Sequence, residues 1–377
     1  MAEAKKLSGA GLRGQVAGET ALCTVGKTGS GLTYRGIDIR ELADNAKFEE
    51  VAYLLLRGKL PNQSELDAYQ EKLSGLRGLP DALKTVLEQI PKDAHPMDVM
   101  RTGCSMLGNL ETEKNDFSDQ LDHIDRMLAV FPSIINYWYN FAHKGKRIQT
   151  DTAADSIAEH FLWTLHDEKP DPLHVKVMHA SLILYAEHEF NASTFTARVC
   201  ASTLSDIHSC VTGAIGSLRG PLHGGANEAA MAMIENWKSA DEAEEKIMGM
   251  LARKDKIMGF GHAIYSTSDP RNAIIKEWSE KLSKQVGDTV LYPVSERVEA
   301  VMWREKKLFC NADFFHASAY YFMGIPTALF TPIFVCSRVA GWTAHVMEQR
   351  ANNRIIRPSA DYTGPEHADW VPIEKRS

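Results

Sequence analysis

Three short segments of the sequence carry side chains whose type and setting suit acid–base chemistry on a bound ligand. The first is GPLHGGAN at 220–227, in which His223 lies between glycines directly before a helical run. Glycines let the backbone approach a ligand closely, and a helix N-terminus favours a neutral imidazole that can donate a hydrogen bond. A histidine in a tight turn is the plainer interpretation of this segment on its own.

The second segment is GFGH at 259–262, followed by SDPR at 268–271. His262 in its glycine loop and Arg271 at a predicted helix start could contact one small anionic ligand from two sides. A structural aspartate–proline helix start explains Arg271 equally well in isolation. These residues therefore indicate an anion site only in combination with other evidence.

The third segment is CNADFF at 310–315, where apolar residues flank Asp313. Burial among such neighbours raises the pKa of a carboxylate and makes it a stronger base toward a carbon acid. The competing interpretation is an ordinary N-cap of the following helix. Asp313 is thus a candidate general base.

Two arginines near the C-terminus are candidates for binding an anion. Arg338 lies in VCSRVAGW at 335–342, an apolar helical stretch where an unpaired charge would cost roughly several kcal/mol, so it should face an anion. Arg357 lies in NRIIRP at 353–358, a segment crowded with arginines. An internal salt bridge is the alternative for each.

The composition is that of an ordinary soluble globular protein, with 44% apolar and 24% charged residues. Its 377 residues predict a large domain with a smaller second one. The net charge of −7 offers no attraction to nucleic acid or to an anionic membrane, so an anionic substrate would need a local cluster of arginines. We therefore expect no nucleic-acid or membrane partner.

The cysteines and the N-terminal segment indicate a cytoplasmic protein. Six cysteines are scattered without C-x-x-C spacing, which is typical of reduced, buried thiols. Residues 1–14 have no apolar run after their lysines, and no stretch approaches the roughly 20 apolar residues of a membrane span.

Other common motifs are absent from the sequence. GKT at 26–28 lacks the glycine of a P-loop, because Ala21 stands at that position. No histidine pair has H-E-x-x-H spacing, so we expect no metal site. The G-x-S-x-G elbow that would indicate a hydrolase is also absent from the sequence.

The hydrophobic periodicity predicts a mostly helical fold. A helix start resembling a capping box is expected at Ser64 with Asp67, and only the first forty residues could hold a short β-hairpin. The last twenty residues, rich in proline, should form an extended tail. Helices are predicted over 48–56, 64–76, 97–107, 124–141, 155–166, 174–185, 196–215, 227–237, 243–251, 271–282 and 314–323.

Taken together, the three segments resemble the citrate synthase family, and the resemblance runs from about residue 22 to the C-terminus. The stretch 259–271 is similar to the family's signature, and 220–227 and 311–314 match two further catalytic segments in the right order. Within the family, the sequence is most similar to 2-methylcitrate synthases at ALCTVGK (21–27), HPMDVMRTG (95–103), 185–195 and IIRPSA (355–360).

The resemblance implies roles for particular residues of this chain. It implies that His223, His262 and Asp313 are catalytic. It further implies that oxaloacetate contacts His188, Asn191, Arg271, Arg338 and Arg357, with Lys72 as a further contact, and that Lys256, Ile257, Met258, Gly259 and Phe260 line the coenzyme A pocket. Arg357 would complete the site of the neighbouring subunit in a homodimer.

The resemblance also implies an all-α architecture with two domains. A large helical domain, 1–219 with 324–377, would bind oxaloacetate and form the dimer interface. A smaller, mobile helical domain, 220–323, would bind coenzyme A and carry His262 and Asp313. No metal or cofactor is implied, because the coenzyme A thioester is a substrate.

The activity implied is condensation of propionyl-CoA with oxaloacetate and water to 2-methylcitrate and CoA, with acetyl-CoA also accepted, in propionate breakdown. A citrate synthase preferring acetyl-CoA is one alternative. A non-catalytic sensor of CoA or organic acids is the other, although a sensor has no use for Asp313.

One departure from the family concerns the CoA phosphates. Many citrate synthases have a basic residue just after the glycine–histidine loop, where this chain has YST at 265–267. Lys276, Arg304, Lys306 and Lys307 are candidates on charge alone, and a solvated helix face explains most of them.

Overall fold

The computed structural model describes residues 11–12, 14–27 and 31–376. Most of the N-terminal segment considered for targeting, and Thr28 of the GKT triplet, lie outside the described residues. The described part of the chain is mostly helical, as predicted, with one small antiparallel sheet near the N-terminus.

The strands are β1 (Cys23–Val25), β2 (Leu32–Tyr34) and β3 (Ile37–Asp38). The helices of the first half are α1 (Ile39–Asn45), α2 (Phe48–Arg57), α3 (Gln63–Ser74), α4 (Asp81–Gln89), α5 (Pro96–Leu110), α6 (Gln120–Lys144), α7 (Ile157–His166) and α8 (Pro172–Tyr185). Those of the second half are α9 (Ala192–Ser202), α10 (Ile207–Leu218), α11 (Ala226–Ile234), α12 (Ala240–Ala252), α13 (Pro270–Val286), α14 (Leu291–Lys306), α15 (Ala312–Phe322) and α16 (Phe330–Ala351), with 3-10 turns η2 (Thr327–Leu329) and η3 (Ile373–Lys375).

The predicted β-hairpin is part of a three-stranded sheet. Strand β2 pairs with β1 through Cys23 opposite Tyr34, and with β3 through Tyr34 opposite Ile37. The buried Tyr34 hydroxyl donates to the carbonyl oxygens of Ile183 and Glu187 at 2.9 and 3.2 Å. The sheet thereby holds the chain where it leaves α8.

Helix starts follow the chemistry of their capping residues, which corrects one prediction and excludes one alternative interpretation. The capping box of α3 is formed by Asn62 and Glu65 rather than by Ser64 and Asp67, because the Asn62 side chain accepts from the Glu65 N–H. Likewise, Asn311 caps α15, so Asp313 lies in the first turn and is not the N-cap.

The helix predicted over 196–215 is in fact two helices, α9 and α10. Leu204 adopts a left-handed backbone conformation with φ of 63°, and the Asp206 side chain caps a new helix by accepting from Ser209 N–H. Apolar residues on both sides hide this break. Helices α1, α4 and α14 lie outside the predicted ranges.

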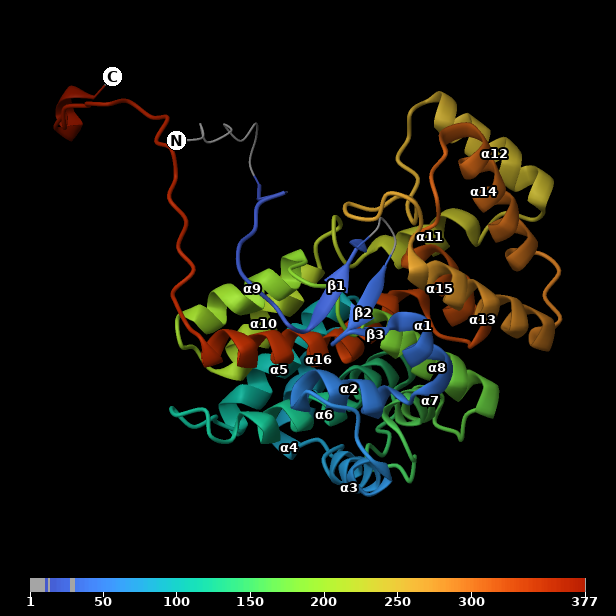
Figure 1. Ribbon diagram of the computed structural model, residues 1–377, viewed down its shortest axis with the longest axis horizontal. Helices are drawn as coiled ribbons and strands as arrows, with labels where there is room; N and C mark the ends of the chain where they lie inside the picture. Colours follow the sequence, from blue (N-terminus) through green and yellow to red (C-terminus); the bar gives the residue numbers. More distant parts are fainter. Residues whose placement is uncertain (1–10, 13, 28–30, 377) are drawn as a thin grey trace.

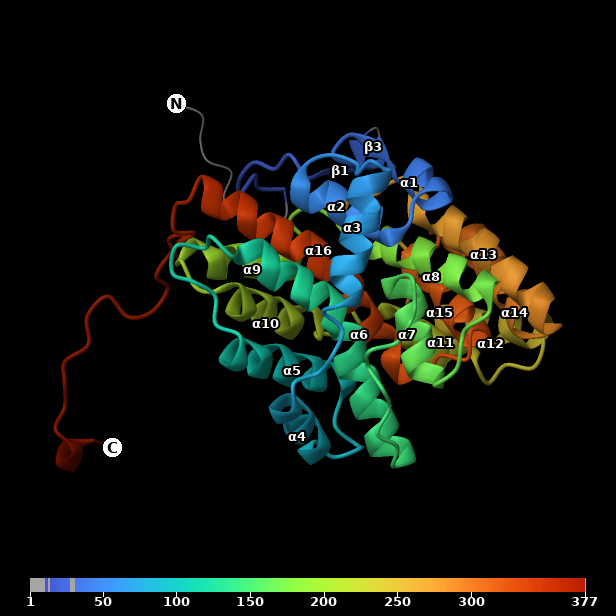
Figure 2. The same cartoon turned by 90° about the horizontal axis from the view of Figure 1, so that it is seen from below.

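The helices form a large body with a smaller group beside it. Helix α16 runs through the body and packs on α9, α6, α8 and α10, while α12 packs on α14 and α13 packs on α15. Figure 1 shows α11 to α15 gathered at one side of the molecule. After α16 the chain leaves the body as the predicted extended tail, which is visible in Figures 1 and 2.

Candidate active site

A cavity of about 820 Å³ lies where the turns before α9, α11, α13 and α15 meet α16. All three predicted catalytic side chains line it. So do the predicted substrate contacts His188, Asn191, Arg271 and Arg338, and the predicted coenzyme A segment Lys256, Ile257, Met258, Gly259 and Phe260. Residues more than one hundred positions apart in the sequence therefore share one cavity.

His223 is held as a neutral imidazole. The backbone N–H of Ser193, in the first turn of α9, donates to His223 Nε2 at 3.2 Å, and the Ser193 hydroxyl lies 2.8 Å from the same nitrogen. With Nε2 as the acceptor of the backbone N–H, the ring proton lies on Nδ1. Burial, assisted by the charge of Arg338, lowers the pKa of His223 to about 4. His223 is thus a hydrogen-bond donor through Nδ1 at neutral pH.

His262 is held in the opposite tautomer. Its Nδ1 accepts from the backbone N–H groups of Ile264 and Tyr265 at 3.1 and 3.2 Å, which leaves the proton on Nε2. Burial, followed by the charge of Arg271, lowers the pKa of His262 to about 4. This imidazole is also a neutral donor.

Asp313 is partly buried at the start of α15, where the Tyr185 hydroxyl donates to its Oδ1 at 2.6 Å. Burial raises the pKa of Asp313, while the Tyr185 hydrogen bond and the charge of Arg271 oppose that rise. The Asn311 N–H donates to Gly259 O, and the Asn311 side chain donates to Gly261 O. Asn311 therefore couples the Asp313 turn to the His262 loop.

The two arginines of the cavity differ in how they are paired. Arg271 donates from Nε and Nη2 to both oxygens of Asp269 at 2.9 and 2.7 Å, and Asp269 is also the N-cap of the predicted aspartate–proline helix start. Arg338 is buried, donates from Nε to Tyr185 O at 2.5 Å, and leaves Nη1 without a hydrogen-bond partner among the described residues. Arg338 therefore has a donor to offer a ligand.

His188 lies against the His262 loop. The His188 and His262 ring centroids are 5.1 Å apart, and His188 Nε2 is 3.1 Å from the Tyr265 hydroxyl. Burial, followed by the charge of Arg271, lowers the pKa of His188 well below its usual value. Neutral imidazoles and cationic guanidinium groups together make the cavity suitable for a small anion.

Two predicted site residues lie elsewhere. The Lys72 ammonium, in α3, pairs with Asp122 at 2.7 Å and Asp125 at 2.8 Å, and Lys72 does not line the cavity. The structure therefore gives no support to a substrate contact at Lys72 within one chain, since carboxylates of α6 engage its charge. Arg357 is exposed in the tail, outside the cavity of its own chain.

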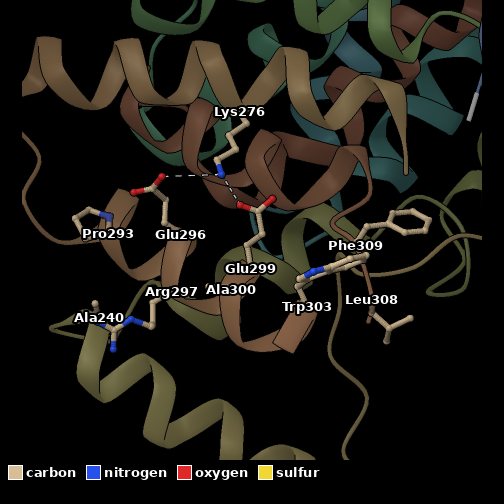
Figure 3. Close-up of a pocket in the computed structure, with 10 residues that line it drawn as sticks. All are labelled: Ala240, Lys276, Pro293, Glu296, Arg297, Glu299, Ala300, Trp303, Leu308 and Phe309. Carbon is tan, nitrogen blue, oxygen red and sulfur yellow. Dashed lines mark hydrogen bonds and ion pairs between the residues drawn. The ribbon is translucent and has the colours of Figure 1, made fainter. Parts of the chain in front are cut away.

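Two of the four basic residues considered for the CoA phosphates, Lys276 and Arg304, pair with carboxylates and do not line the candidate site. Figure 3 shows Lys276 directed toward Glu296 and Glu299 in a separate cavity of about 690 Å³. Arg304 pairs with Glu244 at 2.9 Å. These two cations are engaged by neighbouring carboxylates, whereas Lys256 lines the candidate site itself.

Sequence reasoning missed the residues that support the catalytic side chains. Tyr185 contacts Asp313, Ser193 anchors His223, and Tyr265 contacts both His188 and His262. The one signal in the sequence is that two of these residues lie close to predicted site residues. Ser193 follows Asn191 by two positions, and Tyr265 follows His262 by three.

The family description "Citrate synthase, C-terminal domain" matches residues 11–359. The chain belongs to the citrate synthase family. A curated relative from Shewanella oneidensis, 2-methylcitrate synthase, is 71% identical over 376 residues and both chains are covered completely. Citrate synthase 2 of Bacillus subtilis is 43% identical, with 97% of this chain and 99% of the relative covered.

A solved citrate synthase has the same fold. The enzyme from Thermoplasma acidophilum, in a ternary complex with carboxymethyl coenzyme A and oxaloacetate, superposes with a TM-score of 0.90 at 32% identity, covering 97% of this chain and 98% of that one. The all-α, citrate-synthase-like fold class is thereby confirmed.

The described ranges contain neither a candidate metal centre nor a candidate membrane span. No group of three or more histidine, cysteine, aspartate or glutamate side chains there could hold a metal ion. No described helix combines the length and apolar character that crossing a membrane requires. All six cysteines are free thiols, and only Cys200 is partly exposed.

Proposed function

We propose that the protein condenses propionyl-CoA with oxaloacetate and water, releasing 2-methylcitrate and CoA, and that it also accepts acetyl-CoA. The observation that carries the proposal is the convergence of His223, His262 and Asp313 in one cavity with a free Arg338 donor. The choice of propionyl-CoA is supported by the full-length similarity to a 2-methylcitrate synthase.

The first step is removal of a proton from the carbon next to the thioester. Asp313 accepts this proton, and the negative charge moves to the thioester oxygen. His223 donates its Nδ1–H to that oxygen, and one such donor is worth about 3–4 kcal/mol in other enzymes. A neutral imidazole fits this role because it can donate while its other nitrogen accepts from Ser193.

The second step forms the carbon–carbon bond. The enolate attacks the carbonyl carbon of oxaloacetate, and His262 donates its Nε2–H to the oxygen that becomes an alkoxide and then a hydroxyl. Arg271, Arg338, His188 and Asn191 hold the dicarboxylate in place, which converts the encounter into an oriented one. Water then cleaves the thioester, giving the carboxylate product and the CoA thiol.

The remaining features belong to the same proposal. Segment 256–260 binds CoA, and the unit 220–323 closes on the rest of the chain to shield the thioester intermediate from premature contact with water. Two copies form a homodimer in which Arg357 of each tail reaches the other copy's site. The protein acts in the cytoplasm, in propionate breakdown, without a metal or cofactor.

The test compares kcat/KM for propionyl-CoA with kcat/KM for acetyl-CoA, each in the presence of oxaloacetate. The release of free CoA thiol is the signal that measures the rate. One methylene changes binding by about 1–3 kcal/mol, so we expect both substrates to react and propionyl-CoA to be preferred by roughly tenfold or more. Mass spectrometry should identify 2-methylcitrate. A preference for acetyl-CoA would indicate a citrate synthase, and no thiol release would indicate a sensor.

A further inference from the structure

A buried carboxylate, Glu187, lies next to His188 and takes no part in the proposed chemistry. Its side chain is fully buried in the turn between α8 and α9. Its Oε1 accepts from His345 Nε2 at 2.8 Å and from Cys23 Sγ at 3.6 Å. Its Oε2 has no hydrogen-bond partner among the described residues. A buried carboxylate oxygen without a partner is costly unless a compensating charge lies nearby.

Within the described ranges, the hydrogen bonds around His345 present donors, and no acceptor, to the Glu187 carboxylate. The Arg198 guanidinium, which has only donors, contacts His345 Nδ1 at 2.9 Å, so Nδ1 accepts and Nε2 carries the ring proton. His345 is therefore a neutral donor to Glu187. A proton on Oε2 of Glu187 would find no acceptor in the described part of the chain. The network thus contains a buried anion.

Helix α16 brings a cation to this turn, since Arg338 Nε donates to the carbonyl oxygen of Tyr185, two residues before Glu187. Gly341 lies one turn further along, and a Cβ atom there would overlap Glu187 Oε2, so the carboxylate is pressed against this helix. Burial lowers the pKa of Arg338, and the Glu187 charge is the strongest influence that opposes it. Glu187 and Arg338 nevertheless form no ion pair within 4.0 Å in the described structure.

Arg271 shows the alternative way to neutralise an arginine in this cavity. Asp269 binds its Nε and Nη2 directly, so these donors are occupied before any ligand arrives. Glu187 acts on Arg338 through its charge alone, and Arg338 Nη1 keeps no hydrogen-bond partner among the residues described.

We propose that Glu187 is a positioning residue that balances the charge of Arg338 in the empty site while leaving its guanidinium donor free for a substrate carboxylate. The inference rests on the proposed function, in which oxaloacetate supplies that carboxylate. Because Glu187 and the bound dianion repel each other, Glu187 stabilises the empty enzyme and weakens oxaloacetate binding. It thereby eases the departure of the more highly charged product.

The test is the substitution Glu187→Gln, which keeps an acceptor for His345 and removes the charge. We expect a lower Tm without ligand, because Arg338 loses its counter-charge. We also expect the oxaloacetate Kd, measured by titration calorimetry, to fall by about tenfold. The variant loses the repulsion between the Glu187 carboxylate and the bound dianion, and at an effective dielectric constant near 20 that loss corresponds to about this factor. A purely structural residue would give a lower Tm and equal or weaker binding.

The matched control is Glu348→Gln. Glu348 belongs to the same network, pairing with Arg198 at 2.6 Å, but does not line the cavity. It should lower the Tm and leave the oxaloacetate Kd within about twofold of the wild type. Wild-type protein that fails to bind oxaloacetate would contradict the proposed function. If the wild type binds oxaloacetate and Glu187→Gln binds it equally well or more weakly, the role of Glu187 is overturned.

A stability cycle tests the same pairing without substrate. If Arg338 is the partner, adding Arg338→Met to Glu187→Gln should raise the Tm above that of Glu187→Gln alone, or restore folding if the single variant does not fold. A double variant no more stable than the single one would also overturn the inference.

Discussion

At the scale of single residues, the candidate site rests on two neutral imidazoles with opposite tautomers. His223 carries its proton on Nδ1 and His262 on Nε2, and burial lowers the pKa of each to about 4. Neither ring is a strong base at neutral pH. In the proposed chemistry, Asp313 is therefore the group that takes the carbon-bound proton.

Asp313→Asn should therefore abolish most of the activity. The amide keeps the shape of the side chain and an acceptor for the Tyr185 hydroxyl, but it cannot accept the proton. We expect kcat to fall by about 10²–10⁴-fold, the usual contribution of a general base. Steady-state assay of CoA thiol release measures the loss.

Unchanged Tm and oxaloacetate affinity would show that the Asp313→Asn variant is correctly folded. Near-normal turnover in such a protein would exclude Asp313 as the base.

Sequence reasoning goes furthest with side chains that stand out from their surroundings. His223 and His262 lie among glycines and Asp313 among apolar residues, and this contrast makes all three candidates, whereas their catalytic roles are implied by the family resemblance. Tyr185 and Ser193 sit in ordinary helical patterns, so nothing local distinguishes them. The sequence around Lys72 does not reveal its ion pairs, because its partners, Asp122 and Asp125, belong to a helix fifty positions later.

At the scale of elements, the site depends on how closely α16 approaches the turn after α8. Gly341 permits this approach, because a Cβ atom there would overlap both Ala186 O and Glu187 Oε2. The Arg338 hydrogen bond to Tyr185 O joins the same two elements. The position of His188 is thus set by helix packing.

Gly341→Ala should push α16 away from this turn. We expect overpacking to destabilise the protein by about 1–3 kcal/mol. Since His188 and Arg338 would both shift, the oxaloacetate KM should also rise. Denaturant unfolding and steady-state kinetics would measure the two effects.

Gly249→Ala in α12 is the matched control, because its nearest neighbour is the flexible end of Arg253 at 3.4 Å. Replacing this helical glycine should stabilise the protein by about 0.5–1 kcal/mol. Equal behaviour of the two variants would show that the contact at Gly341 is unimportant.

Amphipathic periodicity predicts most helices but neither their breaks nor their partners. The turn at Leu204 lies in the polar stretch 202–206, where Asp206 caps the next helix, but the apolar periodicity on both sides of it predicts one continuous helix. Helix α14 does carry a signal, since Val294, Val298 and Val301 share one buried face. The meeting of α11, α13 and α15 at one cavity depends on long-range packing, which local patterns do not encode.

At the scale of the whole molecule, several buried histidines link folding to pH. Burial lowers the pKa of His160 and His316 to about 3, and that of His223 and His262 to about 4, from an ordinary value of 6.5. At pH values between the pKa of these histidines in the folded protein and their ordinary pKa of 6.5, the unfolded chain binds more protons than the folded one. The free energy of unfolding must therefore rise with pH through this window.

We expect the protein to keep its full stability above about pH 7 and to lose several kcal/mol as the pH falls from about 6.5 toward 4. Urea unfolding at pH 7.5, 6 and 5, at one protein concentration, would measure this trend. Replacing an exposed histidine, His367, should leave the trend unchanged. Equal stability at pH 7.5 and 5 would contradict neutral burial of these rings.

The backbone anchors of His223 and His262 have an evolutionary consequence. In many enzymes a carboxylate side chain orients the reactive imidazole, and one codon change can delete it. Here the orienting groups are peptide N–H groups of Ser193, Ile264 and Tyr265, which every amino acid except proline supplies. Replacing any one of these side chains by a residue other than proline therefore leaves the peptide donor that orients the ring in place.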